Sequence, residues 1–443
     1  LATGRHTVNF TLLDRAGNEA SSSASFIIDP VMPAIPPDPV EVAPSLDRTA
    51  FTDLFSSTSF LYTGENPIQT GVSPEIIEPK RAAVIRGKVL GADGGPLPGA
   101  TISVLGHPEY GHTVSRQDGF FDLAVNGGGP LTLEYERPGY LPVQRQVQVP
   151  WQDYAWAPDV VMIKSDPQVT EVGMDSPELQ TARGSTITDE DGTRRATLLI
   201  PPGTKLAGLE LQTLHIRATE YTVGEKGPSA MPAELPPQVG YTYCVELSAD
   251  EAEEVRFDRP VYLYVENFLN FPVGGVVPVG YYDRAKGVWV PSANERVIRV
   301  LGIQDDKALL DVDGSGAPAS GEVLTQLGFT EVELHKLAEL YTPGQSLWRV
   351  PVTHFTPWDC NWPYGPPAGA EAPSMPMAAC DGKEDSPCLE TGRSTIELQN
   401  QILRETIGIT GTPYTLNYAG DRVAGHRVAY ILEIPLSVAS NAL

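Results

Sequence analysis

Several common signatures of catalysis are missing from this chain. It contains no G-x-S-x-G elbow, no H-E-x-x-H pair, no phosphate-binding loop and no dinucleotide fingerprint in a βαβ context. His354 lies near Cys360 in sequence, but prolines and tryptophans surround both residues, and we expect Cys360 to be in a disulfide instead of a catalytic pair. We therefore predict that the chain is not an enzyme.

Positive charge and long apolar runs are also scarce. The 31 lysines and arginines face 56 acidic residues, which gives a formal net charge of −25 and a pI near 4.6. This balance opposes binding to nucleic acid or anionic lipid and favours divalent cations. No run of about 18 apolar residues occurs, so we expect no membrane span in this chain.

The start of the chain lacks an initiator methionine and a signal pattern. It opens on Leu1-Ala2-Thr3-Gly4 without a basic segment followed by an apolar one. We expect the sequence to be a fragment of a longer polypeptide.

Cysteine is limited to four residues, namely Cys244, Cys360, Cys380 and Cys388. We expect Cys380 and Cys388 to close a local loop, because a glycine and a proline lie between them, and Cys244 to pair with Cys360. Free thiols are the alternative. Zinc is disfavoured, because no CxxC motif occurs and no histidine lies close in sequence to two of the cysteines.

Length and composition indicate several small globular modules. A chain of 443 residues exceeds the roughly 250 to 300 residues at which single cores stop growing. Glycine and proline total 42 + 41 = 83 residues but are spread along the chain, and 41% of residues are hydrophobic. The composition is typical of turn-rich globular protein rather than disorder.

The pattern along the chain is mostly that of β-strands. Residues 1–30 alternate around an Asp-Arg-Ala-Gly-Asn turn and predict a hairpin, and 31–80 form a proline- and serine-rich linker whose aromatics allow packing on a neighbour. Residues 81–165 predict further strands, with a hairpin turn at Asp118-Gly119. The side chains expected to point inward are Phe121, Leu123, Val125, Leu131, Leu133 and Tyr135.

Residues 166–358 predict a second β-domain. Val261, Leu263 and Val265 alternate with Tyr262, Tyr264 and Glu266, so both faces of this strand should be covered. A cysteine- and proline-rich linker over 359–395 follows, and then 396–443, which includes the segment TGTPYTLNYAGDRVAGHR.

One loop has the spacing of a calcium site. From Asp311, oxygen ligands occur at positions 1, 3 and 5, glycine at 6, a backbone carbonyl at 7 and a carboxylate at 12, as in an EF-hand. The predicted ligands of a structural calcium ion are Asp311, Asp313, Ser315, Ala317 and Glu322. An acidic surface turn is the alternative, and the segment before the loop has the pattern of a strand and turn.

A short helical segment is predicted directly after this loop. Leucines recur at helical spacing from Leu324 to Leu340, and Thr330 with Glu333 forms a capping box. The expected fold class is therefore mostly β, with tandem sandwiches and one short helical segment.

The modules resemble parts of known families. Residues 1–30 resemble the end of a bacterial immunoglobulin-like domain. Residues 81–165 resemble a carboxypeptidase regulatory-like (transthyretin-like) domain, and this resemblance implies a β-sandwich. The stretches 265–301 and 353–367 resemble the plug-type β-domain of teneurin-like proteins, and 396–443 resemble the start of a YD-repeat (Rhs) shell.

This resemblance implies a non-catalytic cap or plug at the N-terminal end of a secreted or cell-surface bacterial YD-repeat shell. The partner would be the downstream shell of the same polypeptide. In such families the shell encloses the protein's own C-terminal segment, which is often a toxin. Packing or plugging residues would be Phe268, Phe271, Trp289, Trp348, Phe355, Trp358 and Trp362, unless these aromatics fill the sandwich core. The alternative is a surface adhesion or carbohydrate-binding protein that contacts a host cell surface.

Overall fold

The computed structural model describes residues 4–13, 19–28, 32–45, 49, 52–221, 227–235, 242–361, 402–408 and 415–421. The chain divides into two units, Leu1–Tyr364 and Gly365–Leu443. In the second unit β27 (Ile402–Gly408) pairs antiparallel with β28 (Thr415–Asp421). The predicted positions Trp362, Cys380 and Cys388 lie outside the described residues.

A separate two-stranded hairpin begins the first unit. Strand β1 (Gly4–Leu13) pairs antiparallel with β2 (Glu19–Ile28), and the register places Val8 opposite Ala24. The predicted hairpin over residues 1–30 is therefore confirmed as a pair of strands.

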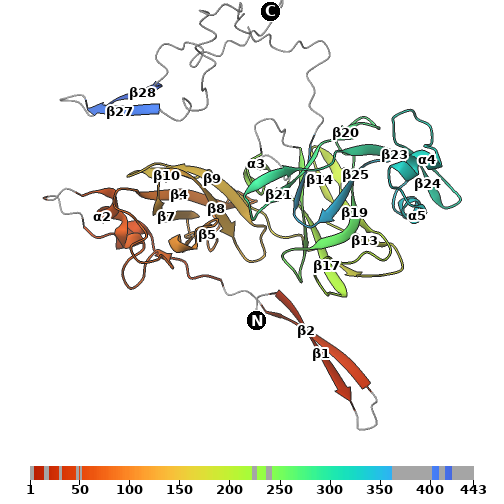
Figure 1. Cartoon of the computed structure of the whole chain (residues 1–443), viewed down its shortest axis with the longest axis horizontal. Helices are drawn as coiled ribbons and strands as arrows, with labels where there is room; N and C mark the ends of the chain where they lie inside the picture. Colours follow the sequence, from red (N-terminus) through yellow and green to blue (C-terminus); the bar gives the residue numbers. More distant parts are fainter. Residues whose placement is uncertain are drawn as a thin grey trace, which may run out of the picture. The chain divides into compact units, whose positions relative to one another are not determined.

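The first domain is a sandwich of two sheets (Figure 1), as predicted for residues 81–165. One sheet contains β3 (Gln69–Thr70), β6 (His112–Val114), β5 (Thr101–Val104), β8 (Gly129–Glu136) and β9 (Val143–Val149). The other contains β10 (Tyr154–Trp156), β4 (Ala82–Gly91), β11 (Val160–Met162) and β7 (Phe120–Asn126). Both β10 and β11 run parallel to β4, at successive positions along it.

The core of the first domain lies between these sheets, where the alternation predicts it. Five of the six expected inward side chains are buried, and Leu131 packs against them partly buried. At the predicted turn, Gly119 has φ of 81°, a conformation that favours glycine. The Asp118 carboxylate accepts a hydrogen bond from the Phe120 amide at 3.0 Å, and this closes the turn.

The segment before the first sandwich is more than a linker. After the short helices α1 (Pro39–Val42) and α2 (Leu54–Thr58) and the 3₁₀ helix η1 (Ser59–Leu61), Leu61 and Ile68 pack on Val84 and Ala124. Residues 52–80 therefore pack on the domain, which is one of the two alternatives that the sequence left open for the segment after the proline cluster. The aromatic side chains Phe55, Phe60 and Tyr62 contribute to this packing, which the composition left open.

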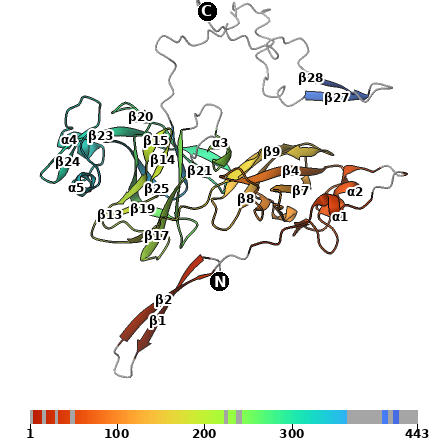
Figure 2. The ribbon, with the colours of Figure 1, turned by 180° about the vertical axis from the view of Figure 1, so that it is seen from behind.

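The second domain is a larger sandwich, and Figure 2 shows its sheets from behind. One sheet contains β12 (Thr170–Gly173), β17 (Thr213–Glu220), β18 (Tyr243–Ala249), β26 (Pro357–Cys360), β21 (Val279–Asp283) and β22 (Val288–Pro291). The other contains β13 (Gln180–Arg183), β16 (Ala196–Ile200), β19 (Arg256–Glu266), β25 (Ser346–His354), β23 (Glu295–Gln304) and β20 (Val276–Val277), with β24 (Lys307–Asp311) paired to β23. A small hairpin joins β14 (Ile187–Asp189) to β15 (Gly192–Arg194).

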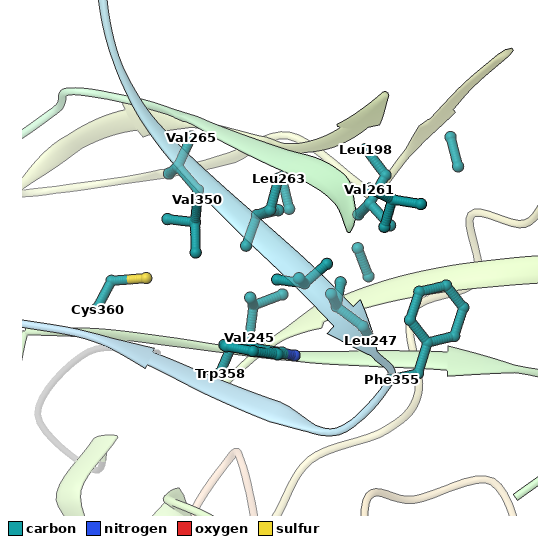
Figure 3. Packing of buried hydrophobic residues seen from close by; sticks show 14 of the residues in the cluster. Leu198, Val245, Leu247, Val261, Leu263, Val265, Val350, Phe355, Trp358 and Cys360 are labelled. Atoms are coloured by element: carbon teal, nitrogen blue, oxygen red, sulfur yellow. The ribbon is translucent and has the colours of Figure 1, made fainter. Parts of the chain in front are cut away.

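Aliphatic and aromatic side chains fill the space between the two sheets (Figure 3). Val261, Leu263 and Val265 of β19 are fully buried there. Trp348 also lies in this core, with its ring 4.8 Å from that of Phe271 and its indole N–H donating to Asn267 Oδ1 at 2.9 Å. Several residues predicted as packing or plugging groups thus fill the sandwich core, namely Phe271, Trp348, Phe355 and Trp358, with Phe268 partly buried against them.

Two helices cover the outer face of the second sheet. Helices α4 (Gly321–Gln326) and α5 (Glu331–Leu340) follow β24, and Leu337 packs with Tyr264 of β19. The predicted capping box is confirmed, because Thr330 and Glu333 cap each other's backbone amides at the start of α5. Both faces of β19 are therefore covered over Val261–Val265, as the alternation predicts.

We predict that Trp348→Ala destabilises the second domain by about 3–5 kcal/mol, because it removes a large side chain from a tightly packed core. Chemical denaturation followed by circular dichroism measures the loss. Trp156→Ala is the matched control, since its side chain is 65% exposed and should shift stability by less than about 0.5 kcal/mol. Equal effects of the two substitutions would contradict the assignment of Trp348 to the core.

Candidate functional site

A polar joint connects the first sandwich to the second. Gln144 and Arg145 lie on β9 of the first domain and contact residues 229–232. The backbone amide of Gln144 donates a hydrogen bond to the Pro232 carbonyl at 2.7 Å. The Arg145 guanidinium donates to the carbonyls of Met231 and Ser229 at 3.0 and 2.8 Å. These bonds link β9 to the residues around helix α3 (Gly227–Ala230).

The side chain of Gln144 forms hydrogen bonds with the hairpin β21–β22. This side chain accepts a hydrogen bond from the Tyr282 hydroxyl at 2.6 Å and donates to the Arg284 carbonyl at 3.0 Å. A Cβ at Gly287, which has φ of 67°, would lie 3.0 Å from the Leu105 side chain, so the turn of the hairpin approaches the first domain closely. Gln144 therefore holds contacts to two separate parts of the second domain.

Charge at the joint is largely compensated within the second domain. Arg284 donates to Glu246 Oε1 at 3.0 Å and to the Tyr221 hydroxyl at 3.0 Å, and Tyr221 donates to the same carboxylate at 2.7 Å. Arg145 has carbonyl partners instead, and burial lowers the pKa of its guanidinium. Since unpaired buried polar groups cost stability, these bonds favour one fixed arrangement of the two domains.

An apolar cluster completes the joint. Buried side chains from both domains meet there, and Trp289 packs against them with its indole N–H donating to the Glu234 carbonyl at 3.0 Å. The cluster comprises Leu141, Val161, Ile163, Tyr221, Ala230, Met231 and Cys244. Trp289, predicted as a plugging or packing residue, is therefore a joint residue.

Cys244 and Cys360 do not form the predicted disulfide. They lie on neighbouring strands, but Cys244 is opposite Asp359 and Cys360 is opposite Tyr243. Because successive side chains of a strand point to opposite faces, this one-residue offset separates the thiols by the sheet. Cys360 lies in the sandwich core (Figure 3), whereas Cys244 lies in the joint cluster. Burial raises the pKa of Cys244 well above its usual range.

Asp359 is a buried carboxyl with an incomplete set of partners. Its side chain is 2% exposed, one oxygen accepts from the Asn361 amide group, and the other has no hydrogen-bond partner. The side chain shares the face of Cys244. Burial raises the pKa of Asp359 to about 7, so the folded protein keeps this carboxyl protonated at pH values where an exposed aspartate is ionised.

A second polar cluster attaches residues 305–340, a helical insertion that contains α4 and α5, to the sheet. Arg349 of β25 donates to Glu333 of α5 at 2.9 Å, and Tyr264 also donates to this carboxylate. The same guanidinium donates to the Leu327 carbonyl at 3.0 Å and lies 4.0 Å from the ring centre of Phe329. The hydrogen bonds are buried or partly buried. Arg349 therefore fixes the position of the short segment between α4 and α5.

An open cleft of about 230 Å³ lies where the insertion meets the β23–β24 hairpin. Its apolar lining includes Leu309, Leu324 and Leu334, with Lys307 and Asp305 at its polar edge. Exposed apolar side chains occur on the same elements, namely Ile303 on β23, Val323 on α4 and Val332 on α5. Among the described residues, these apolar side chains of the insertion and the neighbouring hairpin therefore stay uncovered.

The predicted calcium loop is organised by its own backbone. Asp311 is 1% exposed and accepts hydrogen bonds from the amides of Asp313, Gly314 and Gly316 at 3.2, 2.8 and 2.9 Å. Asp313 accepts from the Ser315 amide at 3.0 Å, and Ser315 accepts from the Ala317 amide at 3.3 Å.

The loop does not assemble three carboxylates. Among the described residues, no three His, Cys, Asp or Glu side chains gather closely enough to hold a metal ion. Glu322 therefore does not complete a set with Asp311 and Asp313 in this arrangement, and calcium binding stays a prediction.

His354 packs among aromatic rings. Its ring centre lies 4.5 Å from that of Tyr281 and 5.2 Å from that of Trp358, and burial lowers its pKa. Cys360 lies in the sandwich core. The surroundings of His354 are therefore those of a packing residue. Within the described ranges, no helix is both long and apolar enough to cross a membrane.

Comparison with known proteins identifies the first domain. Residues 77–162 match the model of the family described as "Teneurin TTR-like domain". Teneurin-3 of Danio rerio is 34% identical over 142 residues, which is 29% of this chain and 5% of the relative. Teneurin-3 of Mus musculus is 40% identical over 120 residues, 27% of this chain and 4% of the relative. Teneurin-m of Drosophila melanogaster is 37% identical over 130 residues, 29% of this chain and 5% of the relative.

Solved structures resemble the chain only weakly. A streptococcal ancillary pilin has 12% identity and a TM-score of 0.18, and covers 30% of this chain and 58% of its own. Hydroxyquinol 1,2-dioxygenase from Pseudomonas putida DLL-E4 has 14% identity and a TM-score of 0.17, and covers 20% and 58%. Similarity at this level carries no argument about fold or chemistry.

The two sandwiches and their joint define a multidomain β-protein with a transthyretin-like module. The family match and the relatives show that this module is of the teneurin type, so the chain contains a teneurin-like N-terminal region with a TTR-like domain. This confirms the predicted resemblance of residues 81–165 to a transthyretin-like domain and to teneurin-like proteins. The plug-type domain, the YD-repeat shell and the bacterial origin stay predictions. The chain covers about one twentieth of the length of the curated relatives that it matches.

We predict that Asp359 makes stability fall as pH rises from about 4 to about 7. The folded state raises the pKa of Asp359 to about 7, above the unfolded value of about 3.9. The folded protein therefore holds the extra proton in this window, and ionisation destabilises it as pH increases.

Asp359→Asn tests this prediction, because it keeps the shape and removes the ionisation. The variant should be more stable than wild type at pH 8 by about 1–3 kcal/mol and show a smaller difference at pH 4. Denaturant titrations at both pH values measure this. Asp313→Asn, at an exposed carboxyl, is the control. A parallel pH dependence of wild type and Asp359→Asn would refute the assignment.

We predict that Asp311→Ala lowers stability by about 1–3 kcal/mol with or without calcium, because three backbone amides lose their acceptor. Asp313→Ala, whose side chain is exposed, should have a small effect in chelator. If the loop binds calcium, the ion raises the Tm of wild type and this rise disappears in Glu322→Gln. Identical melting of wild type in calcium and in chelator would discard the calcium prediction alone.

Proposed function

We propose that this chain is a non-catalytic cap that closes the N-terminal end of a YD-repeat shell formed by the downstream part of the same polypeptide. The observation that carries the proposal is the helical insertion over 305–340. Its exposed side chains Val323 and Val332 are left uncovered by the described residues, yet it is fixed to the second sandwich by the buried contacts of Arg349 and Glu333. A rigid apolar projection is suited to fill an opening in a surrounding wall.

Rigid attachment supports this role. Arg349 contacts Glu333, the carbonyls of Leu327 and Gly328, and the rings of Tyr262 and Phe329. Few side-chain rotamers must then be ordered when the insertion meets its partner, which lowers the entropic cost of binding. The cleft beside Leu324 and Leu334 would receive an apolar side chain of the wall.

The joint gives the TTR-like domain its part in this function. Through Gln144 and Arg145, the first sandwich braces the β21–β22 hairpin and the segment 229–232. A force or a partner acting on one domain is thereby transmitted to the other. We infer that the TTR-like domain is a support for the cap, and that the whole assembly is secreted or displayed on a cell surface.

Capping can be tested in the longer polypeptide that contains this chain and its YD-repeat segment. We predict that Val323→Asp with Val332→Asp weakens closure and speeds proteolysis of the enclosed segment about tenfold or more. Each buried valine contributes roughly 1.5–3 kcal/mol of apolar burial, and 1.4 kcal/mol corresponds to a factor of ten. Limited proteolysis followed by mass spectrometry measures the rate.

Val42→Asp is the matched control, because Val42 is 45% exposed and Val332 is 46% exposed. It lies on α1, away from the insertion in sequence, and should leave proteolysis unchanged. Since Val323 and Val332 are exposed in this chain, their substitution should leave its thermal unfolding nearly unchanged. Unaltered protection of the enclosed segment in the double variant would refute the capping role of the insertion.

A further inference from the structure

The TTR-like domain exposes a group of aromatic side chains that the capping role does not use. Trp151, Tyr154 and Trp156 are 61%, 44% and 65% exposed. Within the described part of the chain, they are the aromatic residues among its exposed large apolar side chains. The three side chains lie within one segment, residues 151–156. Exposed tryptophan is costly for solubility, and exposed aromatic residues near one another in a segment typically mark a binding site.

The position of Trp151 is fixed by two glycines. A Cβ at Gly128 would lie 2.1 Å from the Trp151 indole nitrogen, and a Cβ at Gly127 would lie 1.8 Å from the Pro150 carbonyl oxygen. Only glycine allows this approach of the β7–β8 turn. The next residue, Gln152, has φ of 53°, and its backbone N–H donates a hydrogen bond to the Ala82 carbonyl at 2.9 Å. The loop that carries Trp151 is therefore held in one conformation.

Tyr154 and Trp156 form the second part of the group. They lie two residues apart on β10, so they share one face of the strand at a spacing of roughly 6.6 Å. The Arg86 guanidinium lies 5.7 Å from the ring centre of Tyr154 and 5.9 Å from that of Trp156. One arginine thus bridges the two rings.

Arg86 is held in place by a buried carboxylate of its own domain. Its Nε donates at 2.6 Å to Asp122, a fully buried carboxylate that also accepts from Arg116 at 2.8 Å. Arg116 also lies 3.9 Å from the Asp118 carboxylate, so two carboxylates face the two guanidinium groups and the local charge is balanced. The chain as a whole has a formal net charge of −25. The surface offers flat rings and N–H donors with little net charge. This combination suits a neutral, hydroxyl-rich ligand better than a polyanion or a cation.

We propose that Trp151, Tyr154, Trp156 and Arg86 form a carbohydrate-binding platform for neutral, pyranose-containing glycans. The apolar C–H faces of the sugar rings stack on the aromatic rings, and the sugar hydroxyls accept hydrogen bonds from Arg86. The preset positions of Trp151 and Arg86 keep the ordering cost of binding low. This site is independent of the capping function, because it lies on the TTR-like domain and uses none of the insertion.

The test uses the whole chain and three neutral probes, namely cellohexaose, chitohexaose and a mannohexaose. We expect saturable binding of at least one of them, followed by tryptophan fluorescence and by NMR. Trp156→Ala and Trp151→Ala should each weaken the affinity about tenfold or more. Arg86→Gln should weaken it as well, and circular dichroism checks that each variant is folded.

Ile303→Ala is the matched control, because it removes an exposed apolar side chain from the second domain and should leave the affinity unchanged. A heparin hexasaccharide provides the anionic arm of the test. No saturable binding of any neutral probe would overturn the proposal. So would neutral-probe affinity that both tryptophan variants retain, or binding of the heparin probe alone, since either outcome assigns the surface to another ligand.

Discussion

The buried pair of Arg349 and Glu333 is the interaction on which the shape of the second domain depends. A cation in the middle of strand β25 has to be paired, and its partner comes from a helix that follows the sheet strand β24. Breaking one member of such a pair leaves an uncompensated buried charge, which is far more destabilising than the pair is stabilising. Helix α5 is therefore required by the sheet, and its exposed surface is held at a defined place.

At the joint, too, buried polar side chains need partners, but here the partners are uncharged groups. Arg145 is satisfied by carbonyl oxygens and Gln144 by a hydroxyl and a carbonyl. Hydrogen bonds of this kind require good geometry, and a rotation of one sandwich against the other would leave buried donors without acceptors. Polar contacts thus set the relative orientation of the domains, while the apolar cluster around Met231 supplies much of the attraction.

The sequence patterns predicted local structure well and long-range placement poorly. The capping box of Thr330 and Glu333 and the turn at Asp118-Gly119 were predictable, because each depends on neighbouring residues. The disulfide between Cys244 and Cys360 was wrong, since a one-residue register between β18 and β26 decides the face of each thiol. Arg349 was missed. Its only signal was a charge between Trp348 and Val350 in a strand with two covered faces.

The joint also constrains the order of folding during synthesis. Gln144 reaches Tyr282 and Arg284, residues 138 and 140 positions further along the chain. The first sandwich has all of its own strands long before those residues leave the ribosome, and domains made first generally fold first. Until the second sandwich has been synthesised, Gln144 and Arg145 of β9 are hydrogen-bonded to water. The second sandwich then folds against the first one, which is already formed.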